Sequence, residues 1–207
     1  MEVLIFPDAQ SLARKSADLV ESQIKTFPDS VIGLATGSTP QGLYDELIRR
    51  HKDYHLSFAR VKTFNLDEYV GIPANHPQSY RAFMDDNLFT KINIVSSNTQ
   101  VPDGMAENPL DVGPAYEKMI EEAGGIDLQV LGVGTDGHIG FNEPTSSLGS
   151  ITRVKTLTRQ TMVDNSRFFK SDEFQPKLAI TMGIKTILDA RRILLLACGE
   201  NKAEAIR

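Results

Sequence analysis

The sequence predicts an α/β fold in which helices cover both faces of a mostly parallel central sheet, a doubly wound domain of three layers. Short β-like runs alternate with helix-like segments along all 207 residues, as in sheets built with right-handed crossovers. Most runs are continuously apolar, as expected of strands that helices cover on both faces. No repeat or linker interrupts this pattern, so one domain is expected over residues 1–207.

Six apolar runs are expected to form the parallel strands of this Rossmann-like sheet. They are Val3–Phe6, Val31–Ala35, Val61–Leu66, Leu128–Leu131, Leu178–Thr181 and Ile193–Ala197. Cys198 follows the last run and is expected to be a buried strand residue rather than a reactive thiol. The helix that begins at Lys202 stops after about two turns. The sheet is therefore expected to lack its last elements.

The helices are predicted from apolar residues that recur every three or four positions. One stripe runs over residues 13–27 and a second over 112–123, and a third helix is expected over 41–52. Both stripes are expected to pack in the core. The Pro-, Asn- and Gly-rich stretches 71–77 and 97–109 are expected to be long loops beside a site.

The composition excludes several classes of protein. Apolar residues make up 41% of the chain and charged residues 24%, so it can build a core and is not expected to be disordered. The net charge of −5 comes without a basic cluster, so neither nucleic acid nor an anionic membrane is expected as a partner. The N-terminal apolar stretch is too short for a secretory signal. We therefore expect a cytoplasmic protein.

A turn of small residues, Ala35-Thr36-Gly37-Ser38-Thr39-Pro40, joins a predicted strand to a predicted helix. Gly37 would let the backbone approach a ligand, and free N–H groups at the helix start favour a phosphate. An ordinary capped turn fits these residues equally well. The turn lacks the lysine of a P-loop, which argues against a nucleoside triphosphate.

Two neighbouring carboxylates, Asp67 and Glu68, follow another predicted strand. Adjacent side chains of an extended chain point in opposite directions, so at most one of them faces a shared site. Either this is a solvated acidic turn, or one carboxylate is a general base.

A glycine-rich segment, residues 132–144, follows the strand predicted at 128–131. Its glycines formally match G-x-G-x-x-G, but Gly140 and Pro144 break the helix that a dinucleotide site needs. The segment presents Asp136, His138 and Glu143. Carboxylates can orient an imidazole for proton transfer. A metal site or a structural histidine is the alternative, and we expect no metal.

Two cations, Arg167 and Lys202, could complete a phosphate site if both reach the turn at 36–40. Solvated surface charges are the alternative.

Together these segments resemble the glucosamine-6-phosphate deaminase family. The motifs that carry the resemblance are ATGSTP, FNLDEYVGIP, NHPQSY, GVGTDGHIGFNEP, TRVKTLT, NSRFF and GENKA, in the order and spacing of that family. The resemblance implies that Asp67 moves a proton from C2 to C1 of the open sugar, and that His138, supported by Asp136 and Glu143, opens the ring. It also implies that Gly37, Ser38, Thr39, Arg167 and Lys202 hold the phosphate.

The implied reaction converts glucosamine 6-phosphate to fructose 6-phosphate and ammonia, with no cofactor. Because water adds at C2 as ammonia leaves, we expect a hydrolase of amino-sugar metabolism that acts in N-acetylglucosamine catabolism. The alternatives are a 6-phosphogluconolactonase and a sugar-phosphate sensor without catalysis. Lactone hydrolysis needs no proton transfer at C2, so the Asp67 segment and Glu143 favour the deaminase.

Some members of that family are hexamers activated by N-acetylglucosamine 6-phosphate at a subunit interface. The residues Ser146, Arg153, Lys155 and Thr156 resemble the activator-binding segment of those members, which would make this chain a homo-oligomer. A polar loop that leads into a strand explains the same residues equally well.

Overall fold

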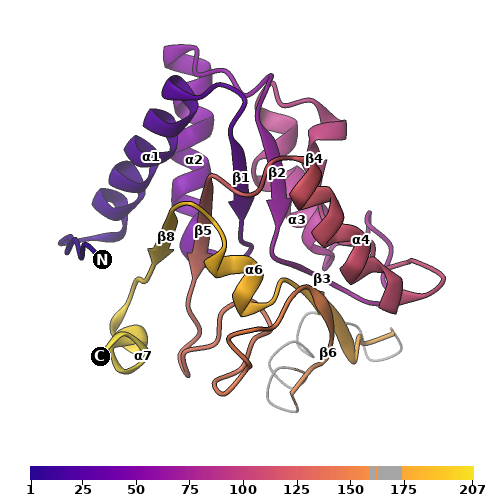
Figure 1. Cartoon of the computed structure of the whole chain (residues 1–207). Helices are drawn as coiled ribbons and strands as arrows, with labels where there is room; N and C mark the ends of the chain where they lie inside the picture. The colour runs from indigo at the N-terminus through magenta and orange to yellow at the C-terminus, as the bar shows by residue number, and fades with distance from the viewer. Residues whose placement is uncertain (159–161, 163–173) are drawn as a thin grey trace.

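The computed structural model of the chain describes residues 1–158, 162 and 174–207 (Figure 1). Its helices are α1 (Ala9–Thr26), α2 (Ser38–Tyr54), α3 (Tyr80–Asn87), α4 (Pro109–Glu122), α6 (Ile184–Leu188) and α7 (Ala203–Ile206). Its strands are β1 (Val31–Leu34), β2 (Lys62–Asn65), β3 (Asp67–Tyr69), β4 (Thr99–Gln100), β5 (Leu128–Gly132), β6 (Arg153–Thr156), β7 (Leu178–Thr181) and β8 (Ile193–Leu196). Short 3₁₀ helices cover Phe89–Lys91, Ser96–Asn98 and Glu200–Lys202.

Five strands form an all-parallel central sheet in the order β4-β2-β1-β5-β8. From β1 the chain first builds outward through β2 and β4, then returns to the other side of β1 for β5 and β8. The strand order therefore reverses between β1 and β5, which is where ligands bind in open α/β sheets. The predicted doubly wound α/β fold is confirmed. In the described part of the chain no helix is long and apolar enough to cross a membrane.

Two apolar layers cover the two faces of this sheet. On one face α1 and α2 pack over β1 and β5, with Ala17, Leu43, Leu47 and Val130 in the core. On the other face α4 contributes Tyr116 to a second cluster. The predicted stripes 13–27 and 112–123 contribute to these two layers, so their periodicity marks helix faces that are buried in part. Phe27 and Met119, which belong to the stripes, are exposed instead.

A second, antiparallel sheet in the order β3-β7-β6 lies beside the first. It includes Leu178–Thr181, which the sequence predicts as a parallel strand; that prediction is wrong for orientation. The sheet is joined to the central one through the backbone, since the N–H of Met182 donates to the carbonyl of Leu66 (2.7 Å). This junction places the first residue of β3 next to the end of β2.

Two other predictions are wrong. Residues 3–6 form no strand, and Val3, Leu4 and Ile5 are exposed, because an apolar run becomes a strand only where a neighbouring strand accepts its hydrogen bonds. Cys198 is exposed rather than buried, since β8 ends at Leu196 at the edge of the sheet.

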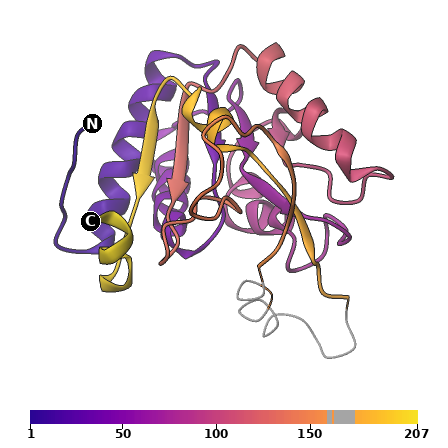
Figure 2. The ribbon, with the colours of Figure 1, turned by 60° about the horizontal axis from the view of Figure 1, so that its bottom comes forward.

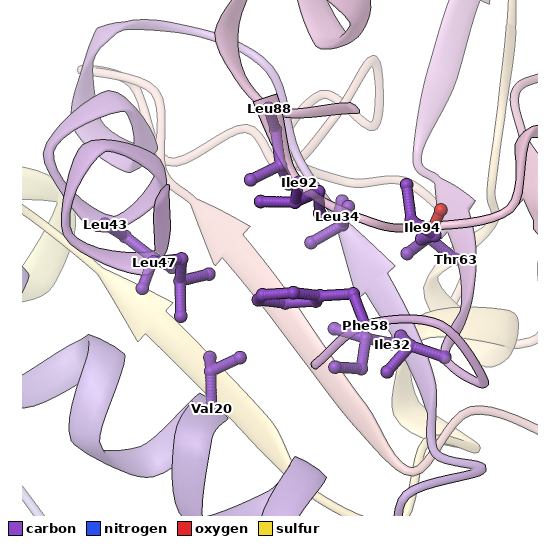
Figure 3. Close-up of a pocket in the computed structure, with 11 residues that line it drawn as sticks. Val20, Ile32, Leu34, Leu43, Leu47, Phe58, Thr63, Leu88, Ile92 and Ile94 are labelled. Atoms are coloured by element: carbon purple, nitrogen blue, oxygen red, sulfur yellow. The ribbon is translucent and has the colours of Figure 1, made fainter. Parts of the chain in front are cut away.

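A small cavity of about 10 Å³ lies within the core between α1, α2 and the central sheet. Figure 3 shows the side chains around it, which are apolar except for Thr63. Thr63 is 3% exposed, and its hydroxyl group has no hydrogen-bond partner among the described residues. A buried hydroxyl without a partner lowers stability, because folding removes its bonds to water and replaces none of them.

Replacing that hydroxyl by a methyl group should stabilise the protein. We expect Thr63→Val to raise the free energy of unfolding by about 1 kcal/mol, which corresponds to a melting temperature about 2–4 °C higher. Thermal unfolding followed by circular dichroism measures the shift. The matched control is Thr99→Val, which should be destabilising because the Thr99 hydroxyl donates to the carbonyl of Ser96 and accepts from Arg81. Equal melting temperatures for Thr63→Val and the wild type would contradict the prediction.

Candidate active site

The segments predicted to carry chemistry gather at one edge of the central sheet. The parallel strands β2, β1, β5 and β8 all end at this edge, and each is followed by one of the predicted segments. In Figure 1 the arrows of β1 and β2 point down towards it, and Figure 2 turns it towards the reader, with α7 and the loops after β5 in front. Side chains 70 residues apart in the sequence can therefore meet there.

Asp67 is the first residue of β3 and is 5% exposed. Glu68 points the other way, as strand geometry requires, and accepts hydrogen bonds from the backbone N–H groups of Tyr69, Tyr80 and Arg81 (2.8–3.0 Å). Glu68 thus holds the start of α3, and Asp67 is the carboxylate that faces the edge with the predicted segments.

The environment of Asp67 raises the pKa of its carboxyl group from 3.8 to about 8. Burial is the main cause, because a charge loses its hydration there, and the nearby carboxylate of Glu68 adds repulsion. A carboxyl group with a pKa near neutrality can accept and return a proton at physiological pH.

His138 and Asp136 form a hydrogen-bonded pair on the loop after β5. The Nδ1 atom of the imidazole lies 2.7 Å from Oδ1 of Asp136, and the backbone N–H of His138 donates to the same oxygen. Partial burial pushes the pKa of Asp136 upward, but these contacts outweigh it and lower the pKa. Gly134 is required here, because a Cβ atom at that position would lie 2.3 Å from Nδ1. The carboxylate therefore orients the ring.

Glu143 belongs to the same group of side chains. One donor atom each from Asp136, His138 and Glu143 lies within 4.8 Å of the others. Two carboxylates and an imidazole at this spacing can orient and exchange a proton, and they are also an acceptable donor set for a divalent cation.

Gly140 brings this loop against Asp67. Its backbone adopts a left-handed conformation (φ 59°), and a Cβ atom there would lie 2.9 Å from Oγ1 of Thr181 and 3.1 Å from Oδ2 of Asp67. Gly140 is two residues from His138, so the buried carboxyl group and the imidazole loop belong to one site. The structure thus brings Asp67 and the glycine-rich segment side by side.

The turn at 35–40 forms the start of α2, but the helix begins at Ser38, three residues earlier than predicted. Gly37 is the N-cap residue with φ 102°, and no side chain caps the helix. The buried hydroxyl of Tyr44 donates to the carbonyl of Ala35 (2.5 Å) and fixes the turn. The first backbone N–H groups of α2 therefore have no side-chain cap, and free N–H groups at a helix start can bind an anion.

A pocket of about 200 Å³ lies next to this turn. It is lined by Ser38 and Thr39, by the first half of α1, and by Leu196 and Cys198 at the end of β8. Lys202, half-buried in the last 3₁₀ helix, follows four residues after Cys198. Arg167, the second predicted cation, lies outside the described residues.

The predicted activator segment is only partly brought together. Arg153 and Lys155 lie on one face of β6, whereas Thr156 points to the other. The Nη2 atom of Arg153 donates to Oδ1 of Asn142 (2.8 Å). Ser146 donates its backbone N–H to the carbonyl of Glu143.

Two polar residues of this region are not among the predicted site residues. Asn142 is 2% exposed and Thr181 is fully buried. Asn142 belongs to the motif GFNEP, but the sequence does not show that its amide is buried. Thr181 closes an apolar strand, and nothing in the sequence distinguishes it from a core residue.

The sequence also matches known proteins over nearly its whole length. Residues 7–207 match the family model described as glucosamine-6-phosphate isomerases/6-phosphogluconolactonase. The chain is 56% identical to a glucosamine-6-phosphate deaminase of Shewanella woodyi and 57% identical to one of Cellvibrio japonicus. Each match covers 100% of this chain, and 78% and 79% of the respective relative.

Solved structures show the same fold. A monomeric glucosamine-6-phosphate deaminase superposes with a TM-score of 0.96 at 44% identity, covering 100% of this chain and 86% of that one. A 6-phosphogluconolactonase from Trypanosoma cruzi has a TM-score of 0.74 at 21% identity, covering 99% of this chain and 83% of that one. This second likeness shows the fold alone.

The expectation of a hydrolase is wrong, because the relatives are named for deamination of an amino sugar, an isomerase-type reaction.

The buried carboxyl of Asp67 should make stability depend on pH. Its native pKa of about 8 lies above the ordinary 3.8. Between about pH 4 and pH 8 the unfolded chain therefore ionises this carboxyl while the native protein keeps it protonated, so the free energy of unfolding falls as the pH rises. Asp67→Asn removes this loss. We expect the variant to melt above the wild type at pH 9, and the difference to shrink towards pH 4.

Thermal unfolding at several pH values measures this difference. The matched control is Asp45→Asn, the same substitution at an exposed residue of α2, so the comparison isolates the effect of burying the carboxyl. A constant difference for Asp67→Asn would contradict the prediction.

Proposed function

Because the chain belongs to the glucosamine-6-phosphate isomerase/6-phosphogluconolactonase family, we propose that it is an enzyme that converts glucosamine 6-phosphate to fructose 6-phosphate and ammonia. Relatives that are 51–57% identical over the whole chain are named for this activity. The observation that carries the proposal is the close approach of the loop of His138 to the buried Asp67 carboxyl, since this reaction needs one proton transfer between oxygens, for ring opening, and another from C2 to C1.

Ring opening comes first and is assigned to His138. A proton must leave the anomeric hydroxyl and another must reach the ring oxygen. The imidazole is half-exposed, with 41% of its side chain accessible, so a sugar can contact it. Asp136 holds the ring in one orientation. The carboxylate of Glu143 lies within 4.8 Å of it, a separation that one water molecule could bridge for proton transfer.

Isomerisation follows and is assigned to Asp67. Its carboxylate takes the proton from C2, the electron pair forms the C1–C2 double bond, and the C1 carbonyl oxygen takes a proton from water, which gives an enolamine. The carboxylic acid then returns the proton to C1, which leaves an iminium group at C2. Water adds at C2 and ammonia leaves. Burial makes the carboxylate more basic than an exposed one, which suits abstraction of a weakly acidic C–H proton.

The phosphate group is assigned to the start of α2. The backbone N–H groups of Gly37, Ser38 and Thr39 carry the positive end of the helix dipole. Lys202, which follows β8, and Arg167 are proposed to add charge-assisted hydrogen bonds. Binding the phosphate there would place the sugar head over the loop after β5, since both lie at the same sheet edge.

We also propose a cytoplasmic enzyme of one domain. We also propose an activator site between the subunits of a homo-oligomer, formed by Ser146, Arg153, Lys155 and Thr156. The cationic face that Arg153 and Lys155 share on β6 supports this site.

The lactonase alternative gains no support, since the solved lactonases are only 19–21% identical and share the fold alone.

A direct assay separates these functions. The wild type should release ammonia from glucosamine 6-phosphate and should not hydrolyse 6-phosphogluconolactone above background. Asp67→Asn and His138→Gln should each lower kcat by about 10²- to 10⁴-fold, since each removes a proton-transfer group. Asp67→Asn should still bind the sugar phosphate in calorimetry. Lactone hydrolysis without ammonia release would overturn the proposal, and wild-type turnover in Asp67→Asn would show that Asp67 is not the base.

The pH dependence of kcat/KM offers a second test. Asp67 acts as a base only when it is ionised, and its pKa is raised to about 8. Activity should therefore rise with pH and level off above about 8, rather than above about 4. The second ionisation of the substrate phosphate lies near pH 6, so a rise centred there would report the substrate and would count against Asp67 as the controlling group.

A further inference from the structure

Three residues form a row across the small antiparallel sheet. Thr181 of β7 is paired with Asp67 of β3 on one side and with Arg153 of β6 on the other. Directly opposite residues of neighbouring antiparallel strands point to the same face, with Cβ atoms about 5 Å apart. The side chains of Asp67, Thr181 and Arg153 therefore line up on one face.

Three consecutive residues of the loop after β5, residues 140–142, lie along this row. Gly140 approaches both Asp67 and Thr181, so closely that a Cβ atom there would touch them. The backbone N–H of Phe141 donates to Oγ1 of Thr181 (3.2 Å). Next along the loop, the amide oxygen of Asn142 accepts from Arg153 (2.8 Å).

Asn142 ties the loop down at two further points. Its Nδ2 group donates to the carbonyl of Ile139 (2.9 Å), which closes the loop, and to the carbonyl of Met182 (2.8 Å), just after β7. The amide is 2% exposed. A buried amide that satisfies two carbonyls and one guanidinium holds backbone from both segments in place, because breaking any of these bonds leaves a buried polar group unpaired.

We propose that Thr181 and Asn142 are positioning residues that hold the loop of His138 and Glu143 against Asp67 and shield the Asp67 carboxyl from water. This inference rests on the proposed function. The hydrogen bonds of both side chains within the described residues go to the loop, to Met182 and to Arg153, and none goes to Asp67 or His138. Their effect is to fix the distance between the two proton-transfer groups and to keep the proton taken from C2 on Asp67 until it reaches C1.

Shielding has a measurable consequence when the reaction runs in D₂O. A carboxylic acid that is covered by the loop returns the substrate's own hydrogen to C1, whereas an uncovered one exchanges with solvent first. Thr181→Val removes the acceptor for the Phe141 N–H at nearly constant volume. We expect it to raise the deuterium content at C1 of early-formed fructose 6-phosphate at least twofold, measured by mass spectrometry.

The same variant should lower kcat by about 10- to 100-fold, the usual effect of a small displacement of catalytic groups. KM should change by less than about threefold, because the phosphate turn at 37–39 is not touched. Thr181→Ser, which restores the hydroxyl, should return both values towards the wild type. Gly140→Ala, on a partly exposed loop, should act like Thr181→Val by pushing the loop from Asp67.

Ser30→Ala is the matched control. Like Thr181, Ser30 has a buried side-chain hydroxyl. This hydroxyl donates to the carbonyl of Phe27 and accepts from Gln23. Ser30 precedes β1 and therefore lies at the opposite end of the sheet. It should lose stability without changing the deuterium content. If Thr181→Val and Gly140→Ala lose activity with wild-type deuterium content, they act through stability alone and the proposal is overturned.

Amide hydrogen exchange of the peptide around Phe141 tests the anchoring without any turnover. The Phe141 amide should exchange faster in Thr181→Val and Gly140→Ala than in the wild type or Ser30→Ala. Equal protection would overturn the positioning role. A wild type that makes no fructose 6-phosphate but shows this exchange pattern would refute the proposed function and leave the anchoring standing.

Discussion

The burial of one carboxyl group, that of Asp67, is the constraint on which the site depends. Asp67 sits where the parallel sheet ends and the antiparallel sheet begins, with its neighbour Glu68 turned to the opposite side. Water is displaced from it by the loop after β5, which can come this close only because residue 140 is a glycine with φ 59°. Burial both raises the basicity of the carboxyl and lowers stability, so the surrounding structure must be firmly held.

Backbone and buried polar contacts supply that hold from several directions. The hydroxyl of Tyr116 donates to the carbonyls of Asn65 and Gln100, which fixes the end of β2 just before Asp67. The Met182 N–H reaches the carbonyl of Leu66 and joins the two sheets at the same point. Glu68 fixes the start of α3 through three N–H groups. The position of Asp67 is therefore determined by three different parts of the fold.

Much of the fold could be predicted from the sequence because its central strands are strongly apolar. The runs at 31–35, 61–66, 128–131 and 193–197 correspond to β1, β2, β5 and β8 within one or two residues. The strands β3, β4 and β6 could not be predicted, since they have only two to four residues and are largely polar. The orientation of β7 follows from its pairing with β3 and β6, so it could not be predicted either.

The candidate site shows the same division. Asp67, Asp136 and His138 stand out in the sequence because titratable groups at strand ends point to chemistry. Thr181 and Asn142 do not stand out, because what matters about them is a partner about 40 residues away in the chain. Among the described residues, the hydroxyl of a strand threonine can be left without a partner, as at Thr63 inside β2, or accept a hydrogen bond from the loop, as at Thr181 at the end of β7. Only the register between β3, β7 and β6 distinguishes the two, because it places Thr181 beside Asp67.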